Sequence, residues 1–341
     1  LPLEQLLAGH ENTVNKLTIT GDVIDESILD TQARLGNISA LVYVGGVVGY
    51  NQSSTILEIS NVENITLVEA TAYIEREESG TVTDQDGTTH NVTIGVDLEG
   101  NTKLYSYAGG IIGRVAQNVT LENCKNRDVG EVRSQGTYTG GLAELNEGRI
   151  LNCRAGSLGD GTRDYIGGLV GVNLGIIENC SVSGTIMGNS RIGGLVSENY
   201  GQIINPSVGA AEGCYIEVTG QDAGGVAGYG FAGSSVAWDK GVSIDINING
   251  SGRRVGGVMG TNEGTVTVAM AGSNMDQVIE NMEDNSVIGH SYVGGFIGVQ
   301  KGKASLQNMY NYAEVQAEQG FAGGIAAWVS QAASGGEGES T

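Results

Sequence analysis

The sequence predicts an all-β protein folded as a parallel β-helix, that is, a β-solenoid whose coils stack on one another. A Gly-Gly pair followed by apolar residues recurs nine times along the chain. Most copies lie about 30 residues apart, a period typical of solenoids, propellers or arrays. The segments between copies are short, rich in Val, Ile and Thr, and show no helical period. β-Branched residues favour strands.

The repeat begins with two residues, the second of them small or apolar, that precede the two glycines. The nine copies read YVGGVVGYN, YAGGIIGRV, YTGGLAELN, YIGGLVGVN, RIGGLVSEN, DAGGVAGYG, RVGGVMGTN, YVGGFIGVQ and FAGGIAAWV. Their second glycines are Gly46, Gly110, Gly141, Gly168, Gly194, Gly225, Gly257, Gly295 and Gly324. The interval from Gly46 to Gly110 is about twice as long as most of the others, so it indicates a degenerate copy or an insertion.

Each repeat offers two or three short strands joined by bends. After the glycines come two apolar residues, often a third Gly, and then a segment such as NLGIIENC at 173–180. Asn and Gly suit tight bends with positive φ. Because no helix crosses over, parallel stacking pairs each strand with its counterpart one coil away. We therefore expect about ten coils of roughly 30 residues in a right-handed helix; a propeller is the weaker alternative, since a blade needs four strands and ~40 or more residues.

The repeats assign most of the chain to one domain. We expect residues 1–40 to form an N-terminal cap or a first degenerate coil, and residues 41–330 to form the solenoid. A solvated loop near residues 75–91 accounts for part of the long first interval. The small, polar and acidic residues of 331–341 are typical of a tail or linker.

Composition excludes several classes of partner. With 39 acidic and 17 basic residues, the formal net charge of −22 would repel nucleic acid and anionic lipid surfaces. No apolar run approaches the ~18 residues that a membrane span requires. The first residues, LPLEQLLAGHENTV, show no targeting signal. We expect neither nucleic acid binding nor a membrane span.

Cysteines at a fixed distance from the glycines predict a column. The offset from Gly141 to Cys153 equals that from Gly168 to Cys180, and Pro206 takes the equivalent place in the next unit. Cys124 follows its own second Gly at a slightly longer offset. Stacked in adjacent coils, the three cysteines would form a buried column of small side chains.

No bond or metal is expected in this column. Parallel Cβ directions make a disulfide poor, and no Cys/His clamp supports zinc. Cys214 lies outside the column.

Asparagines recur at both bends of the unit. Asn152, Asn179 and Asn205 directly precede Cys153, Cys180 and Pro206, so they too share one offset from their second glycines, and Asn123 is a further candidate. The other bend offers Asn146, Asn173, Asn199 and Asn262. Asn tolerates left-handed φ and can hydrogen-bond its neighbour in a stack, so we interpret both sets as structural ladders rather than ligand sites.

An aromatic residue leads six of the nine copies. These residues are Tyr43, Tyr107, Tyr138, Tyr165, Tyr292 and Phe321. Strict alternation places each on the same side as the first apolar residue after the glycines, while the second apolar residue faces the other way. Either the double Gly is a bend that resets the alternation, which we favour, or the strand is apolar on both faces. The second case leaves a surface stripe, interrupted by Arg191, Asp222 and Arg254, that would bind glycans by ring stacking or a protein partner.

The sequence does not define catalytic residues. It lacks HExxH and GxSxG, and its three histidines are isolated. Parallel β-helices do host lyases and glycosidases with acids stacked on one face. The acids considered for such a face are Asp160, Asp164, Glu144 and Asp222. Their offsets from the glycines differ, so a non-catalytic protein is the better interpretation.

A metal site has little support either. Asp84, Asp86 and His90 lie in a DxDG segment that resembles the start of a calcium loop but lacks the remaining ligands. We expect no cofactor, with bound calcium as a weak alternative.

The repeats, with residues such as YIGGLVGVN and RVGGVMGTNEG, resemble the GLUG motif family over residues 41–330. This family occurs in secreted and surface proteins of bacteria, including large adhesins and the non-catalytic region of immunoglobulin A proteases. The chain departs from the pattern where Glu144 and Ser197 replace the third Gly. It also departs where Arg191, Asp222 and Arg254 replace the leading aromatic residue.

The resemblance implies a non-catalytic solenoid segment of a larger bacterial surface or secreted protein. Its leading function would be that of a stalk or adhesin that presents a long acidic surface to a host protein or glycan. One alternative is an accessory region that positions a substrate for a secreted immunoglobulin A protease-like metallopeptidase. Another is a polysaccharide lyase or hydrolase built on the β-helix.

Overall fold

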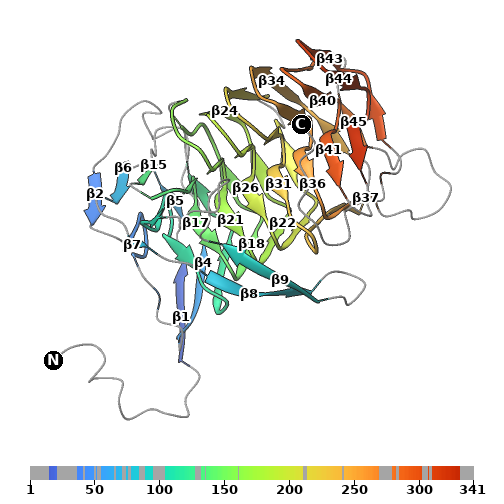
Figure 1. The fold of residues 1–341 in the computed structure, drawn as a ribbon. Helices are drawn as coiled ribbons and strands as arrows, with labels where there is room; N and C mark the ends of the chain where they lie inside the picture. Colours follow the sequence, from blue (N-terminus) through green and yellow to red (C-terminus); the bar gives the residue numbers. More distant parts are fainter. Residues whose placement is uncertain are drawn as a thin grey trace.

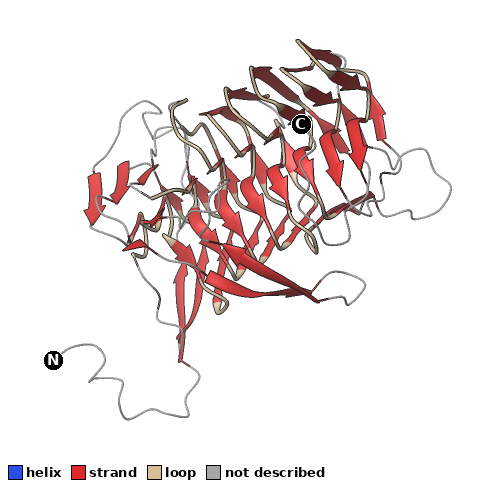
Figure 2. Cartoon of the chain, in the orientation of Figure 1, coloured by secondary structure: helices blue, strands red, loops and turns tan. Residues whose placement is uncertain are grey.

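The computed structural model describes residues 15–20, 37–40, 43–49, 51, 55–64, 67–70, 74–75, 78–83, 89–94, 104–126, 132–134, 136–159, 161–209, 213–239, 242–268, 279–281, 284–301, 306 and 309–330. All regular structure in these residues is β-strand (Figure 2). The coils follow one another along one axis from β1 to β45 (Figure 1). Apart from two antiparallel pairs, the strands pair in parallel, which confirms the predicted parallel β-solenoid.

Residues 165–190 show one complete coil. Its five strands are β20 (Ile166–Gly167), β21 (Val170–Asn173), β22 (Ile176–Glu178), β23 (Ser181–Val182) and β24 (Gly184–Gly188). The next coil repeats this order with β25 to β29. Equivalent strands of successive coils therefore build five sheet positions, named here the first to fifth sheets in chain order from the glycines.

The first sheet carries the Gly-Gly motifs. Its strands are β3 (Val44–Gly45), β11 (Ala108–Gly109), β16 (Thr139–Gly140), β20, β25 (Ile192–Gly193), β30 (Ala223–Gly224), β35 (Arg254–Gly256), β40 (Tyr292–Gly294) and β44 (Phe321–Gly323). The two-stranded part β3–β11 joins the rest through the hydrogen bond from the Gly110 N–H to the Gly141 carbonyl.

The second and third sheets each contain eight strands. The second sheet is β12 (Arg114–Val115), β17 (Ala143–Asn146), β21, β26 (Val196–Asn199), β31 (Ala227–Gly230), β36 (Met259–Asn262), β41 (Ile297–Lys301) and β45 (Ala326–Ser330). The third sheet is β1 (Asn15–Thr20), β4 (Thr55–Ser60), β13 (Val119–Glu122), β18 (Arg149–Leu151), β22, β27 (Gln202–Ile204), β32 (Ser235–Trp238) and β37 (Thr265–Val268). The nine strands of the first sheet and the eight of each of these sheets show that at least nine coils stack in the described part of the chain, against the ten or so expected.

The fourth and fifth sheets are each divided into a five-stranded and a three-stranded part. The fourth contains β5 (Glu63–Asn64), β14 (Lys125–Asn126), β19 (Arg154–Ala155), β23 and β28 (Ser207–Val208), then β33 (Val242–Ile244), β38 (Ile279–Asn281) and β42 (Met309–Asn311). The fifth contains β2 (Asn37–Ala40), β6 (Leu67–Ala70) and β15 (Val132–Ser134), then β24, β29 (Cys214–Val218), β34 (Ile246–Gly250), β39 (Ser286–Gly289) and β43 (Glu314–Ala317).

The long first interval contains a hairpin where a solvated loop was expected. Strands β8 (Glu78–Thr83) and β9 (Thr89–Ile94) pair only with each other in the described residues, and β7 (Ile74–Glu75) pairs antiparallel with β10 (Leu104–Tyr105). Alternating Thr and Val residues on both arms supply the strand propensity that the loop interpretation overlooked. In the N-terminal region β1 and β2 already belong to solenoid sheets. The predicted tail, 331–341, lies outside the described residues.

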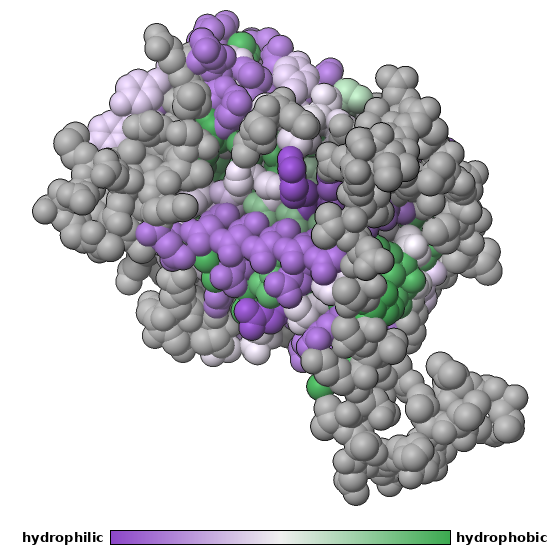
Figure 3. Space-filling view, turned by 180° about the vertical axis from the view of Figure 1, so that it is seen from behind, coloured by the Kyte–Doolittle hydropathy of each residue, from purple (hydrophilic) through white to green (hydrophobic). Residues whose placement is uncertain are grey.

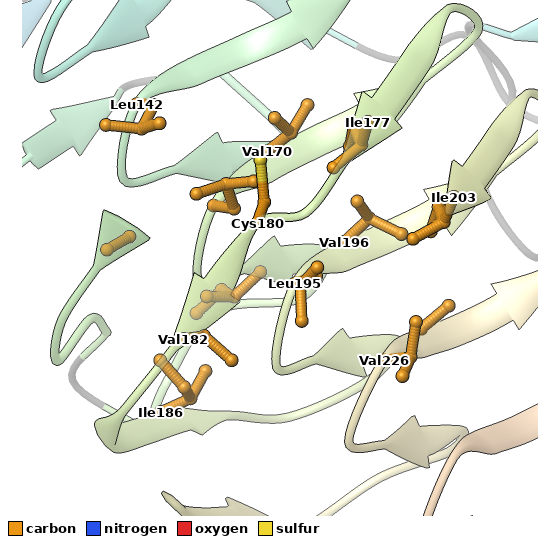
Figure 4. Packing of buried hydrophobic residues seen from close by; sticks show 14 of the residues in the cluster. Leu142, Val170, Ile177, Cys180, Val182, Ile186, Leu195, Val196, Ile203 and Val226 are labelled. Carbon is orange, nitrogen blue, oxygen red and sulfur yellow. The ribbon is translucent and has the colours of Figure 1, made fainter. Parts of the chain in front are cut away.

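The interior of the coil holds the main hydrophobic core. In the seven copies from Gly110 to Gly295 the first residue after the Gly pair is fully buried there, as in Leu169 and Leu195, and so is the second, as in Val170 and Val196. Figure 4 shows Val170, Leu195 and Val196 together with Cys180 in the interior of neighbouring coils. Full burial of one such side chain stabilises the fold by about 1.5–3 kcal/mol.

Two consecutive residues face inward because the chain bends at the glycines. Gly168 and Leu169 form a bend between β20 and β21, and the leading residue Tyr165 has a positive φ of 56°. A Cβ on Gly168 would lie 2.2 Å from the carbonyl oxygen of Gly194 in the next coil. The double Gly therefore serves both a bend and a close backbone approach.

The outer surface is mainly polar. On β29 the side chains alternate, so Ile216 is buried while Tyr215 and Glu217 face outward. Figure 3 shows a continuous band of hydrophilic residues along the side opposite to the view of Figure 1. Within the described residues, no helix is long and apolar enough to span a membrane.

Candidate binding face

Two rows of side chains meet on the outside of the bend between the first and second sheets. The lead row contains the residues before each Gly motif: Tyr43, Tyr107, Tyr138, Tyr165, Arg191, Asp222, Arg254, Tyr292 and Phe321. The facing row contains their register-matched neighbours on the second sheet: Arg114, Leu145, Val172, Glu198, Tyr229, Thr261, Val299 and Trp328. We call the two rows together the lead face. Its character changes along the solenoid from apolar to charged to aromatic.

The N-terminal part of the lead face is a small second core. Tyr107, Tyr138 and Tyr165 are 0–3% exposed and pack with Leu145 and Val172. The alternative of one exposed aromatic stripe therefore does not apply to these three tyrosines, because residues of the second sheet cover them. The chain bends at the double Gly, as we favoured, so the alternation of inward and outward side chains restarts there. Side chains of the second sheet also fill the outer side of the bend.

Tyr43, the first residue of the lead row, packs against the second core. The Tyr43 ring stacks on that of Tyr107 with centroids 5.0 Å apart and an interplanar angle of 4°, and Tyr43 is only half-buried. It therefore ends the second core on the N-terminal side.

The middle of the lead face holds two buried ion pairs. Arg254 donates two hydrogen bonds to Asp222, from Nε to Oδ1 at 2.6 Å and from a terminal nitrogen to Oδ2 at 2.7 Å. The Thr261 hydroxyl donates to the same carboxylate. Asp222 itself is fully buried. A bidentate, hydrogen-bonded geometry of this kind offsets the desolvation cost of a buried carboxylate.

The second pair is enclosed by aromatic rings. The Arg191 guanidinium donates to Glu198, whose other oxygen accepts from the Tyr138 hydroxyl at 2.6 Å. The Arg191 Cζ atom lies 4.5 Å from the Tyr229 ring centroid. Burial lowers the pKa of Arg191, but the charges of Glu198 and Asp222 outweigh it and raise that pKa overall. These charges therefore neutralise one another inside the lead face, although the Arg191 Nε has no hydrogen-bond partner among the described residues.

The charged part reaches solvent through a third pair. The Tyr229 hydroxyl donates to the Glu263 carboxylate, and the Lys301 Nζ lies 3.3 Å from that carboxylate and 3.2 Å from the hydroxyl. The side chains of Lys301 and Glu263 are 42% and 30% exposed. Burial and the Glu263 charge raise the pKa of Tyr229, so this tyrosine stays a hydrogen-bond donor at neutral pH.

The C-terminal end of the lead face is aromatic and accessible. Tyr292 and Phe321 stack with centroids 5.6 Å apart, and the Trp328 ring lies 6.1 Å from the first and 5.3 Å from the second. Phe321 is 48% exposed and Trp328 is 44% exposed. Of the six predicted aromatic residues, only Tyr292 and Phe321 belong to this open cluster.

Sequence reasoning missed Trp328. Its offset from its second Gly, Gly324, is the same as that of Val299 and Tyr229 from theirs. Aligning that offset in addition to the leading residue would have placed Trp328 beside the lead row.

The cysteine column lies inside the solenoid. The backbone N–H of Cys124 donates to Sγ of Cys153 at 3.3 Å, and the N–H of Cys153 donates to Sγ of Cys180 at 3.3 Å. All four cysteines are free and buried, including Cys214 on β29. Burial raises the pKa of Cys153 and raises that of Cys214 to about 12. The Cys153 and Cys214 thiols therefore pack as small apolar groups rather than as nucleophiles. The hydrogen bond with Cys153 instead lowers the pKa of Cys124.

The two asparagine sets occupy different environments. Asn152, Asn179 and Asn205 have φ of 50–52° at an exposed corner, where the Asn205 amide donates to Asn179 at 3.1 Å. The other set is buried: the Asn146 amide donates to Asn173, and that of Asn173 to Asn199, both at 2.8 Å. Gly230 interrupts this row, which resumes with Asn262, whose amide donates to Gln300.

The acids considered for catalysis do not line one open face. Asp164 accepts a hydrogen bond from Asn189, whereas Asp222 is buried in its ion pair. Asp160, Asp84 and Asp86 lie outside the described residues. Of His90 only the backbone, in β9, is described. In the part of the chain that the structure describes, no three His, Cys, Asp or Glu side chains gather as metal ligands would.

Glu144 is the exceptional acid. It is fully buried, and its Oε2 accepts from the Ala108 N–H and the Ser134 hydroxyl, both at 3.2 Å. Its Oε1 has no hydrogen-bond partner among the described residues. Burial raises the pKa of Glu144 from 4.5 to about 8, against the opposing effect of these hydrogen bonds.

These features define a parallel β-solenoid with short glycine-bent coils, whose lead face is buried over its tyrosines and ion pairs and accessible at its C-terminal aromatic cluster. A family model for the GLUG motif matches residues 163–187, which span nearly the whole coil from Tyr165 to β24. The chain therefore contains the GLUG motif that its sequence resembled. No curated protein and no solved structure matches the chain significantly.

Proposed function

We propose that this chain is a non-catalytic segment of a bacterial cell-surface or secreted protein, where it acts as a stalk or adhesive module toward a host protein or glycan. The observation that carries the proposal is the combination of a rigid parallel solenoid containing a GLUG motif with one accessible aromatic cluster on the lead face. Stacked coils hold a surface at a fixed distance along the solenoid axis, as a stalk must. Clustered exposed aromatic residues are typical of recognition surfaces.

The environment of the acids supports a non-catalytic role. A glycosidase needs two carboxyl groups on either side of an accessible glycosidic bond. Glu144 and Asp222 are both fully buried, and Asp222 is held by Arg254. Neither is presented to a polymer outside the solenoid.

The proposal is tested by binding and turnover with the same sample. The purified chain should bind members of arrays of host surface proteins and glycans. The same sample should release no reducing ends from uronic-acid polymers. Product release from such polymers would assign the chain to the polysaccharide-active class instead. Absence of retention on both arrays would contradict the adhesive role.

A further inference from the structure

The first and fifth sheets are both interrupted between the coil that begins at Tyr107 and the coil that begins at Tyr138. In the first sheet β11 pairs with β3, and β16 starts the seven-stranded part; the two parts meet only where the Gly110 N–H donates to the Gly141 carbonyl and just beyond. In the fifth sheet β15 pairs with β6, whereas the next coil is tied to β24 by an isolated bridge. The second, third and fourth sheets continue through both coils as β12–β17, β13–β18 and β14–β19. The pairing is therefore broken along one side of the solenoid.

The Glu144 side chain lies at this break. In the following pair of coils, the N–H of Thr139 donates to the carbonyl of the next lead residue, Tyr165. The Ala108 N–H, at the equivalent position, donates instead to Oε2 of Glu144 at 3.2 Å. A carboxyl group from the second sheet therefore takes the place of a backbone carbonyl in the first sheet.

Two serines complete a buried polar cluster around this carboxyl group. The Ser134 hydroxyl donates to the same oxygen, Oε2, at 3.2 Å. The Gly136 N–H donates to Oγ of Ser106 at 2.9 Å and to Oγ of Ser134 at 3.1 Å. Both serines are at most 2% exposed. We call this cluster the seam; its members are Ser106, Ala108, Ser134, Gly136 and the side chain of Glu144.

The hydrogen bonds of the seam satisfy only one oxygen of Glu144. The Ala108 N–H and the Ser134 hydroxyl both reach Oε2, whereas Oε1 has no hydrogen-bond partner among the described residues, although the side chain is fully buried. An ionised carboxylate needs donors at both oxygens, and a buried charge without them is costly. A neutral acid leaves a single polar group unpaired, at a smaller cost. The closed seam therefore favours the neutral acid.

The charged and titratable side chains that border the seam do not compensate an ionised Glu144. They are Arg114, Arg133, Arg163, Tyr107 and Tyr138. Arg163 donates to the Ser134 carbonyl, and Arg133 faces outward on β15. Arg114 is paired with Glu147 beside the Tyr107 ring, and the Tyr138 hydroxyl donates to Glu198. These groups therefore leave the Oε1 atom of Glu144 without a donor.

We propose that Glu144 is a pH-dependent latch on this side of the solenoid. As a neutral acid it holds the seam closed. Once it is ionised, water enters to hydrate Oε1 and the two coils loosen at the seam, while the second, third and fourth sheets stay paired. This inference does not depend on the proposed adhesive function.

The pH window of the latch follows from the two environments of the carboxyl group. Burial in the closed seam raises the pKa of Glu144 to about 8, whereas an open, hydrated seam returns that pKa toward 4.5. The latch is therefore fully effective below about pH 4.5, and its effect is lost as pH rises to about 8. Within this window the equilibrium constant for opening should rise by up to about tenfold per pH unit.

Hydrogen exchange followed by mass spectrometry tests the latch at pH 5 and at pH 7, after correction for the intrinsic pH dependence of amide exchange. In the wild type, peptides covering residues 104–113 and 132–142 should open at least about tenfold more at pH 7. Peptides from β13 and β18, in the third sheet of the same coils, should change by less than about twofold, since they exchange through other local openings.

Three variants make the test specific. Glu144→Gln keeps the shape of the side chain without its titration, and Glu144→Gly installs the residue that six of the other copies carry at this position. In both variants, exchange in the seam should no longer depend on pH. Glu178→Gln is the matched control, because it removes a partly exposed carboxyl group outside the seam. It should keep the pH dependence of the wild type.

Three results would overturn the latch. The first is corrected exchange in the wild-type seam that is the same at pH 5 and pH 7. The second is pH dependence that survives in Glu144→Gln or, if that variant does not fold, in Glu144→Gly. The third is an equal rise in the seam and in the third sheet, since whole coils would then unfold together. None of these results bears on the adhesive role, which the binding arrays test separately.

Discussion

The backbone N–H of Cys153 donates to Sγ of Cys180, one coil further along the solenoid, and Cys124 makes the same contact with Cys153. Residues at equivalent places in the repeat therefore sit directly over one another, and each coil provides the template for the next. The effect of a substitution on stability can therefore be predicted from the position of the residue in the repeat and from the burial of its side chain.

A charge in the core should disrupt more than one coil. Val170→Asp places an unpaired carboxylate where the side chain is fully buried between neighbouring coils, at a cost of about 4 kcal/mol or more. Hydrogen exchange should rise in the coils on both sides, because each pairs with the altered one. Thr185→Asp on the outer side is the control. A melting profile unchanged by Val170→Asp would contradict the assigned core, and Leu195→Asp should behave in the same way.

Glu144 should make stability fall as pH rises. Its folded-state pKa is raised to about 8 by burial, whereas an exposed carboxyl titrates near 4.5. The stabilisation by the protonated group is therefore complete below about pH 4.5 and is lost as pH rises to about 8, by a few kcal/mol. Glu144→Gln removes the titration, so urea unfolding near pH 5 and near pH 8 should differ less for the variant than for the wild type. Equal pH slopes would show that Glu144 is not buried as described.

Breaking the Asp222–Arg254 pair should be costly. Asp222→Asn leaves a largely buried guanidinium without its charged partner and should destabilise the fold by about 3–5 kcal/mol. Replacing both residues together, as Asp222→Leu with Arg254→Met, should recover much of that loss. The exposed pair Arg149–Glu178 is the comparison, and Glu178→Gln should cost less than ~1 kcal/mol. Equal effects in the two pairs would refute the distinction between them.

The two asparagine ladders should respond differently to the loss of one side-chain amide. Asn173→Ala removes the central member of a buried amide chain, leaving Asn146 and Asn199 each without one hydrogen bond, and should cost roughly 1–3 kcal/mol. Asn205→Gly at the exposed corner keeps the positive φ of 50° without strain and lets water replace the lost hydrogen bonds, so it should cost less. Thermal unfolding of the two variants decides this, and a larger loss for Asn205→Gly would contradict the burial difference.

The fold could be predicted from the sequence because glycine pairs mark its repeat. The nine Gly pairs identify where the backbones of adjacent coils approach closely, and the registers Gly140 with Gly167 and Gly167 with Gly193 follow that alignment. The fixed offsets of Cys153 and Cys180 likewise anticipated their stacking. A spacing rule suffices where each coil repeats its neighbour.

The lead face could not be predicted in the same way. Alternation could not decide the side of Tyr165, because the chain bends and this residue itself has a positive φ. Nor does spacing reveal that Tyr165 is covered by a second row, or that Arg191 pairs with Glu198 in its own coil. Such contacts depend on the angle between two sheets, which a repeat pattern does not encode.

The stacking register itself is the central claim, and spin labels test it most directly. Glu217 and Asn249 are exposed register partners on β29 and β34, so their Cα atoms should be about 4.8 Å apart. Nitroxides on Glu217→Cys and Asn249→Cys should show strong dipolar broadening, whereas Glu122→Cys with Asn249→Cys, on different sheets and several coils apart, should not. Spectra of the first pair that equal the sum of the two single-label spectra would contradict the stacked register.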